Sequence, residues 1–312
     1  MSSDPQELVK TKATDLSALT AFIRLENDDA HLSAEYLNWW FFQNPSNSFS
    51  FWHYLYDNEL VGVATTNNFH LQTPSGRKTA AMPQKVLTSA SMRGKGLFGK
   101  LYWQTEKDNL ENGVDYFLTI TNEMSTPIFL KKFGYLRGQS PDVITILPSI
   151  KALVSGKNYE EVESSAITDT QKHQNNGFIK DAEHLRWRYS SDAPQKSIIL
   201  KVTGKNGEVA GYVFLKKIYK KRLPLYILLD LLILQESASV QLLSEAVKYT
   251  TRKLSLGLLA LDREDLSEHW SKFMHRRVQN RFNFLVKGRD EEETQQLAET
   301  KFNLTFGDLD FI

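Results

Sequence analysis

The residues best suited to chemistry lie in one short segment, 86–98, where a strand runs into a turn and then a helix. The turn holds Gly94 and Gly96, with Arg93 and Lys95 beside them. Glycine lets the backbone approach a ligand closely, and a helix that begins there offers N–H groups and the positive end of its dipole. The segment therefore predicts a cradle for an anion, and pyrophosphate is the anion that it suits.

This turn differs from two common phosphate-binding patterns. It lacks the Gly-x-x-x-x-Gly-Lys-Ser/Thr spacing of a Walker loop and the third glycine of a dinucleotide fingerprint. A lone Gly-x-Gly also occurs in ordinary strand-to-helix turns, so the motif by itself leaves that alternative open.

The elements that must position the cradle alternate along the chain. Apolar periodicity and turn residues predict them. In the first half, helices are expected at about 15–26, 33–42, 96–112 and 126–133, and strands at about 8–13, 51–56, 60–66, 78–89, 114–121 and 143–147. After a polar stretch at 155–178, helices are expected at 180–189, 238–253 and 265–276, and strands at 197–203, 208–219, 225–234, 256–261 and 281–286.

A faint internal repeat links the two halves. Leu37-Asn38-Trp39 and Leu185-Arg186-Trp187 each precede a proline, a hairpin and a glycine. The spacing from tryptophan to glycine is 23 residues for Trp39 and Gly62, and 24 for Trp187 and Gly211. The shared order predicts a duplicated α/β unit, with coincidence among common residue types as the alternative.

The segment from Arg93 to Phe98 resembles the acyl-CoA loop of the GNAT superfamily of N-acetyltransferases, whose pattern is Arg/Gln-x-x-Gly-x-Gly/Ala. Phe98 stands where that pattern has a small residue. A second landmark, Asn122 followed by the segment 128–135, resembles the Asn … aromatic-x-Lys … Gly-Phe part of the same fold. The resemblance covers about residues 8–150.

The resemblance implies an α/β (α+β) fold with two GNAT-like mixed-sheet units in tandem. We expect a catalytic domain at 1–150, a linker or excursion at 151–178 and a degenerate GNAT-like domain at 179–312. In the second unit the cradle position is Gln235-Glu236-Ser237-Ala238-Ser239, which has no glycine and carries a carboxylate. A carboxylate repels a pyrophosphate, so this unit is expected to bind no CoA.

The resemblance also implies acetyl-CoA as the co-substrate and assigns its binding residues. The pantetheine arm would pair with the strand at Val86, Leu87 and Thr88, and the backbone from Gly94 to Phe98 would hold the pyrophosphate. The full expected set is Val86, Leu87, Thr88, Arg93, Gly94, Lys95, Gly96, Leu97, Phe98, Asn122 and Phe129. Lys95, Lys100 or Lys131 could reach the 3′-phosphate, or could be solvated surface charges.

The function implied is transfer of an acetyl group from acetyl-CoA to a primary amine of a small molecule, with an amino sugar as the specific acceptor considered. The resemblance assigns no general acid, because Leu130 stands here at the position where many relatives have a tyrosine. Tyr135 is the nearest alternative, unless it is a core aromatic. A thiolate can also leave without an acid.

Several groups are candidate bases. Glu35, His31 and His70 lie near segments that border acceptor sites in such folds. Asp230 lies in a strand between leucines, where a buried carboxylate could be a perturbed base or a satisfied structural group. Some tandem relatives use the carboxylate of the chain terminus, which would involve Asp308, Asp310 or Ile312.

The amino-acid composition argues against several other functional classes. The 312 residues carry 38 basic and 37 acidic side chains, so a nucleic-acid surface is not indicated. The basic run at 216–222 could bind an anionic acceptor or be a solvated hairpin tip. With no cysteine, a disulfide scaffold, a zinc–cysteine site and a cysteine nucleophile are excluded, and no metal is expected.

Targeting signals are not evident. The longest apolar run, 223–234, is shorter than the roughly 20 residues of a membrane-spanning helix, and we expect a cytoplasmic protein. An aminoacyl-tRNA-dependent peptidyl transferase-like protein and a non-catalytic CoA-binding protein remain as alternatives. The near-neutral charge and the 93–96 turn argue against the first of these. The acyl length and the oligomeric state are not indicated.

Overall fold

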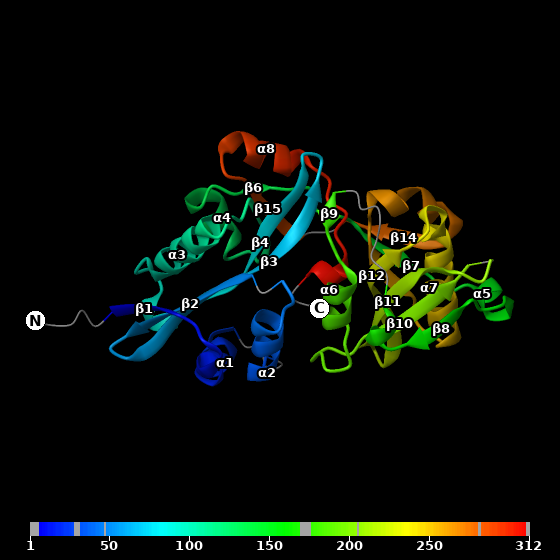
Figure 1. Cartoon of the computed structure of the whole chain (residues 1–312), viewed down its shortest axis with the longest axis horizontal. Coiled ribbons are helices and arrows are strands. Elements are labelled where there is room, and N and C mark those ends of the chain that lie inside the picture. The colour runs from blue at the N-terminus through cyan, green and yellow to red at the C-terminus, as the bar shows by residue number, and fades with distance from the viewer. Residues whose placement is uncertain are drawn as a thin grey trace, which may run out of the picture.

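The computed structural model describes residues 6–27, 32–46, 48–168, 176–204, 206–279 and 282–309. They form two mixed sheets, one at each end of the elongated molecule (Figure 1). The first sheet has the order β1 (Gln6–Lys10), β2 (Phe49–Tyr56), β3 (Glu59–Thr73), β4 (Gly76–Thr88), β5 (Tyr116–Thr121), β15 (Asn283–Lys287), β6 (Leu136–Arg137), with β9 (Gly177–Phe178) added to β3.

The second sheet repeats that order. It runs β8 (Tyr159–Val162), β10 (Ile198–Thr203), β11 (Val209–Lys220), β12 (Leu223–Ile233), β13 (Leu258–Leu261), β7 (Val143–Ile146), β14 (His275–Val278). In each sheet the fourth and fifth strands are parallel and share two residue pairs, Ala80–Tyr116 and Ala81–Phe117 in the first, Tyr226–Leu258 and Ile227–Leu259 in the second. The duplicated unit that the repeat predicts is confirmed.

The helices cover both sheets. In the first half they are α1 (Leu16–Asn27), α2 (Ala34–Leu37), a π-helical segment (Asn38–Phe42), α3 (Leu97–Glu111) and α4 (Thr126–Lys132). The others are α5 (Ile150–Val154), α6 (Ala182–Arg188), α7 (Ser239–Arg252) and α8 (Glu291–Glu299). Short 3-10 turns occur at Ala13–Asp15, Ala90–Met92, Ser164–Ala166, Glu236–Ala238, Glu264–Lys272 and Phe306–Asp308. Within the described ranges, no helix is long and apolar enough to cross a membrane.

The two sheets exchange one strand each. The strand expected to end the first unit, β7, lies in the second sheet, and the strand expected in the second unit, β15, lies between β5 and β6 of the first sheet. The division expected at residue 150 therefore does not follow the sheets. Periodicity identifies a strand but not its partner, because pairing is decided by which apolar faces are buried together.

Three other expectations differ from the structure. The helix expected at 265–276 is the 3-10 turn at 264–272, followed by β14. The helix expected at 33–42 changes to π-helical geometry at Asn38. The expected linker carries β8 and β9, one strand of each sheet, while its residues 169–175 lie outside the described part.

The largest buried cluster lies between the two sheets. It combines Leu71, Met82 and Leu118 of the first sheet with Phe214 and Leu229 of the second. The opposite face of the first sheet packs on α3 and α4 through a separate cluster that contains Ala81, Phe117 and Phe129. In β5, and in β4 up to Gln84, even-numbered side chains therefore point toward the second unit and odd-numbered ones toward α3 and α4, as the alternation of a strand requires.

Candidate active site

The site begins with a bulge in β4. Gln84 pairs with Thr65 and Leu87 pairs with Val63, so two residues of β4, Lys85 and Val86, lie opposite the single residue between those partners. Lys85 has a positive φ of 23°. Such a bulge bends its strand. Since β4 and β5 pair only at 80–81 and 116–117, the two strands separate after that point.

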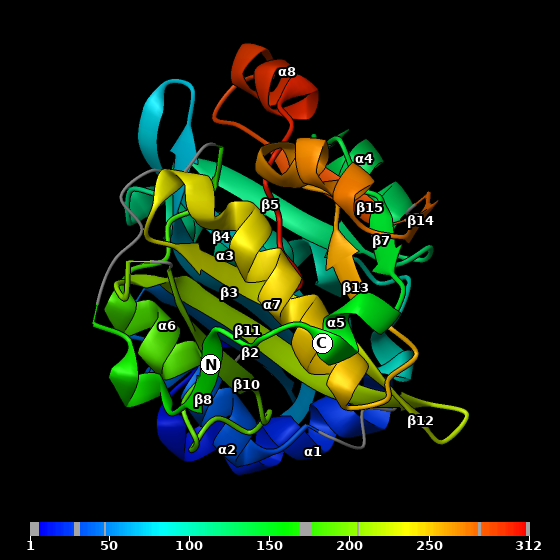
Figure 2. The ribbon, with the colours of Figure 1, turned by 90° about the vertical axis from the view of Figure 1, so that its right-hand side faces the viewer.

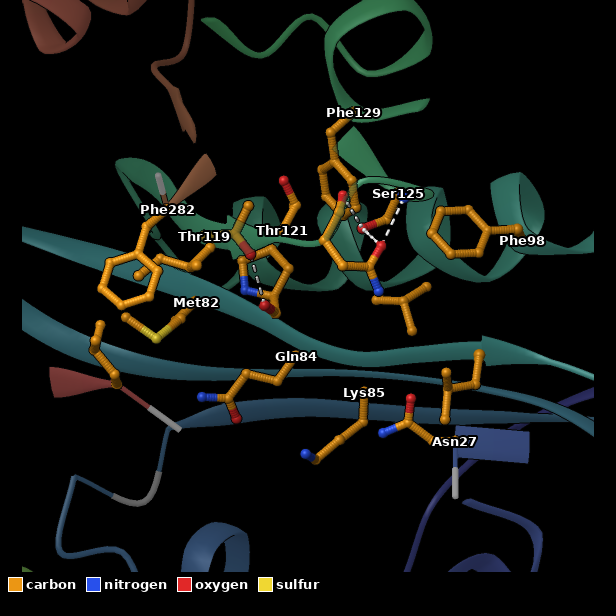
Figure 3. A pocket seen from close by; sticks show the side chains of 16 residues that line it. Asn27, Met82, Gln84, Lys85, Phe98, Thr119, Thr121, Ser125, Phe129 and Phe282 are labelled. Carbon is orange, nitrogen blue, oxygen red and sulfur yellow. Dashed lines mark hydrogen bonds between the residues drawn. The ribbon is translucent and has the colours of Figure 1, made fainter. Parts of the chain in front are cut away.

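A cavity of about 450 Å³ lies where the strands separate (Figure 3). Phe98 lies at one end of it, and Met82 and Phe282 lie at the other (Figure 3). Residues from both faces of the sheet line it, so the cavity passes between the strands. The lining residues are Asn27, Met82, Pro83, Gln84, Lys85, Val86, Leu87, Phe98, Thr119, Ile120, Thr121, Asn122, Ser125, Phe129, Phe282 and Leu309.

The expected anion cradle adjoins this cavity. Gly94 and Gly96 have φ of 77° and 79°, in the left-handed region that favours glycine, and Gly96 is the N-cap of α3. A Cβ atom on either glycine would have no atom within 4 Å, so the space above the turn is open. The first N–H groups of a helix have no partner inside it, and they point with the dipole toward this space. The geometry can hold a pyrophosphate.

The cationic side chains of the turn, Arg93 and Lys95, do not line the cavity. The guanidinium of Arg93 pairs with Glu26 at 2.9 Å, and Glu26 also accepts a hydrogen bond from the N–H of Ala90. Arg93 therefore ties the turn to α1 and does not line the cavity. Lys95 is exposed beside it. The attraction for an anion here rests mainly on backbone groups.

Phe98 replaces a small residue without blocking the turn. Its ring lies edge-on to Phe129 and stacks on Phe133, with centroid distances of 6.2 and 6.1 Å. Asn122 begins the turn that leads into α4, because its Oδ1 accepts hydrogen bonds from the N–H and hydroxyl of Ser125. Thus Val86, Leu87, Phe98, Asn122 and Phe129 of the expected set line the cavity, whereas Thr88 and 93–97 lie next to it.

The structure does not bring Tyr135 or Glu35 to the cavity. Tyr135 is buried in the core, where its hydroxyl lies 2.5 Å from that of Tyr102, and burial raises its pKa well above the usual value. Glu35 is exposed at the start of α2, where a backbone hydrogen bond and one from Ser33 lower its pKa. Neither residue lines the cavity. His70 is not among the lining residues either, and His31, Asp310 and Ile312 lie outside the described residues.

Asp230 is held in a buried charge cluster. Its carboxylate contacts the Lys180 ammonium and the hydroxyls of Tyr189 and Thr305, and the same ammonium contacts Asp308 at 2.6 Å. Burial would raise the pKa of Asp230, but the Lys180 charge and these hydrogen bonds outweigh it, so its pKa is lowered. For Asp308, burial and the neighbouring Asp230 outweigh Lys180, and its pKa is raised. Asp230 is thus buried and fully paired, and it does not line the cavity.

Eleven of the 16 lining residues lie outside the expected set, and Met82, Gln84, Phe282 and Leu309 are among them. Met82 and Gln84 precede the bulge, and Phe282 and Leu309 come from the far end of the chain. The alternation of β4 could have placed Met82 and Gln84 on one face. No local signal places Phe282 or Leu309, because only the strand exchange and the path of the C-terminal segment bring them here.

Comparison with known proteins bears on the fold. No protein-family model matches the sequence, and no curated protein matches it either. A GCN5-related N-acetyltransferase from Anabaena variabilis has a TM-score of 0.69 at 11% identity, over 94% of this chain and 75% of that one. Eis1 from Mycobacterium abscessus has a TM-score of 0.63 at 13% identity, over 95% and 76%. Saccharomyces cerevisiae N-myristoyltransferase with bound myristoyl-CoA has a TM-score of 0.59 at 10% identity, over 92% and 80%.

The chain has the GNAT fold. The strand order, the parallel pair that separates and the helix that begins at the turn occur twice in it. Each copy of the GNAT fold also places its repeat glycine against the helix that follows the cradle position, since a Cβ on Gly62 would contact Leu97 and Leu101 of α3, and one on Gly211 would contact Leu242 of α7.

In the second copy of the GNAT fold, little space remains beside the parallel strands β12 and β13. Leu304 and Thr305 of the C-terminal segment line a space of only about 10 Å³ together with residues of β12 and with Leu261 of β13. The hydroxyl of Thr305 donates to Asp230 at 2.9 Å, which fixes the segment. The N-cap of α7 is also Ala238, whereas the N-cap of α3 in the first copy is Gly96. These features support the expectation that the second unit binds no CoA.

Proposed function

We propose that the chain is an acyl-CoA-dependent N-acyltransferase whose CoA site is the cavity between β4 and β5. The observation that carries the proposal is that this cavity adjoins the open helix N-terminus at Gly96. An anion-binding turn and an apolar channel of this kind match the two ends of a CoA thioester, its pyrophosphate and its pantetheine arm.

The acyl group proposed is short, with acetyl as the simplest case. Met82 and Phe282 give the end of the cavity away from Phe98 an apolar lining, and Leu309 is a further apolar lining residue. The acceptor proposed is the primary amine of a small molecule, an amino sugar being one candidate. The absence of cysteine fits a reducing compartment, and we place the activity in the cytoplasm.

The reaction needs few groups from the protein. The neutral amine attacks the thioester carbonyl, the carbon–sulfur bond breaks, and its electron pair leaves on a thiolate, while the amine loses one proton. Hydrogen-bond donors aimed at the carbonyl oxygen would stabilise the charge that develops there. Among the described lining residues none is a carboxylate or a histidine, so no side chain is assigned as the base.

The lack of a carboxylate or histidine among the described lining residues favours a second candidate function. In this second candidate, the protein binds CoA without transferring an acyl group. Release of free thiol from acetyl-CoA in the presence of a panel of primary amines separates the two. Turnover with any amine supports the transferase, whereas binding without turnover across the panel supports the second candidate.

Calorimetric titration with acetyl-CoA tests the site. We expect micromolar binding that Gly96→Glu abolishes, because the substitution places a carboxylate and a strained backbone in the cradle. Gly113→Glu is the matched control, since Gly113 also has a φ of 79°, also has no atom near its Cβ position and ends α3 rather than beginning it. Absence of wild-type binding to both acetyl-CoA and CoA would remove the acyltransferase proposal.

A further inference from the structure

The side chain of Gln84 has an unusual place in the cavity. Gln84 is 9% exposed, and it lies on the opposite side of β4 from Ser125 and Phe129 (Figure 3). Its Oε1 accepts a hydrogen bond of 2.6 Å from the indole N–H of Trp40. Within the described part of the chain, its Nε2 is buried and has no partner.

The orientation of this amide follows from the chemistry of its partner. An indole N–H can only donate, so the oxygen of Gln84 must face Trp40 and the NH₂ group must face away. Trp40 cannot easily turn, because Trp187 stacks on it at 5.6 Å and the guanidinium of Arg188 lies 4.6 Å from its ring centroid. Asn67 also donates to the backbone oxygen of Trp40 at 2.7 Å, within the π-helical segment. The donor of Gln84 is therefore fixed in direction.

A buried donor without an acceptor destabilises a protein, so such a group points to an oxygen that another molecule supplies. The length of the pantetheine arm of CoA indicates which oxygen could accept this hydrogen bond. Leu97 at the start of α3 lies against Gly62, which pairs with Thr88, so the cradle is level with the end of β4. The pantetheine arm has about twelve bonds from phosphate oxygen to sulfur, as many as about four residues of extended chain. Gln84 lies four residues back from Thr88, and the bulge shortens that span to three residues of β3, so an extended arm reaches at least as far as Gln84.

We propose that Gln84 Nε2 donates a hydrogen bond to the carbonyl oxygen of the bound acyl thioester, an inference that rests on the function proposed above. When the amine forms its bond to the carbonyl carbon, the carbonyl π electrons move onto that oxygen. The same donor then stabilises the oxyanion until the carbon–sulfur bond breaks and the thiolate leaves. Trp40 is a positioning residue, because it acts only by holding the amide.

The test compares two ligands, acetyl-CoA and S-ethyl-CoA, which has a methylene group in place of the carbonyl. We expect the wild-type protein to bind acetyl-CoA about fivefold more tightly, as one net hydrogen bond allows. Gln84→Met should bring that ratio close to one. Gln84→Glu should invert it, because the carboxylate keeps the Trp40 bond and faces the carbonyl with an oxygen.

Two further variants separate this role from a structural one. Thr65→Val removes another buried hydroxyl without a described partner, on the residue that pairs with Gln84, and should leave the ratio unchanged. Trp40→Phe should lower the ratio partway, since the amide can then turn. An equal ratio in wild type and Gln84→Met would overturn the proposal.

Infrared spectra of acetyl-CoA labelled with ¹³C at the carbonyl give a measurement that does not depend on any variant folding. We expect the carbonyl stretch to lie at lower frequency in the wild-type complex than in solution, and to rise in Gln84→Met. A stretch that does not change on binding would overturn the proposal even where CoA binds. Failure of the wild type to bind either ligand would instead count against the proposed function.

Discussion

At the scale of single residues, Lys180 is the cation that pairs with two buried carboxylates. Its side chain is 11% exposed, and its ammonium contacts the carboxylates of Asp230 and Asp308, whose side chains are both 3% exposed. Asp308 belongs to the C-terminal segment and Asp230 to β12, so one lysine joins the segment to the second sheet. Arg188 adds to this by donating to the carbonyls of Gly307 and Leu309.

We expect Lys180→Met to lower the free energy of unfolding by about 3 to 5 kcal/mol, because it leaves two buried carboxylates without their counter-charge. Lys201→Met is the control, since Lys201 pairs with Glu160 at 3.0 Å at the surface and such pairs contribute about 1 kcal/mol or less. Denaturant unfolding of both variants measures the difference. Equal losses would show that the cluster is not what holds the segment.

At the scale of elements, the bulge in β4 creates the site. Two residues, Lys85 and Val86, occupy the place of one, and the strand bends away from β5. Gln84 pairs with Thr65 and Leu87 with Val63, and these two partners lie on the same face of β3, so Gln84 and Leu87 also face the same way although they are three residues apart. The register between β3 and β4 therefore shifts by one residue at the bulge.

Deleting Lys85 should straighten β4 while keeping these pairs. It also removes a residue at a positive φ of 23°, so we expect an unchanged or slightly raised melting temperature. Binding of acetyl-CoA should weaken by at least about tenfold, since straightening closes the gap that bulges open beside active sites. Lys85→Gly keeps the bulge and should keep binding. Tight binding by the deletion variant would show that the gap does not depend on the bulge.

The sequence predicts these elements unevenly. The geometry of the turn at Gly94 and Gly96 depends on the conformational freedom of glycine and on the dipole of the helix that follows. Because both are local properties, this geometry could be predicted from about eight residues. The bulge at Lys85 has no glycine, and its local signal is Pro83, because a proline inside a sheet is found mainly at edges and bulges. Gln84 could not be selected from the sequence, because its fixed orientation depends on Trp40, 44 residues away. Local chemistry predicts the cradle, and tertiary packing decides the rest of the site.

At the scale of the whole molecule, the matched tryptophans of the internal repeat contact each other. Trp39 and Trp187, the matched residues of the two copies, stack on each other with ring centroids 5.0 Å apart. Each indole N–H donates to the backbone oxygen of the other residue, at 3.4 and 3.2 Å. Such reciprocal contacts are what a two-fold relation between equivalent units produces. The repeat thus identifies the place where the two units meet, although it does not reveal the exchange of β7 and β15.

That exchange predicts how the chain behaves when it is divided. A fragment of residues 1–150 keeps β7 without its partners β13 and β14, and lacks β15 between β5 and β6. It also exposes Leu71, Met82 and Leu118, which pack against the second sheet in the full chain. We therefore expect the fragment to show no cooperative thermal transition by circular dichroism and no calorimetric binding of acetyl-CoA, whereas refolding it together with residues 151–312 should restore both. A fragment that melts cooperatively and binds acetyl-CoA alone would show that the first unit folds as an independent domain despite the exchanged strands.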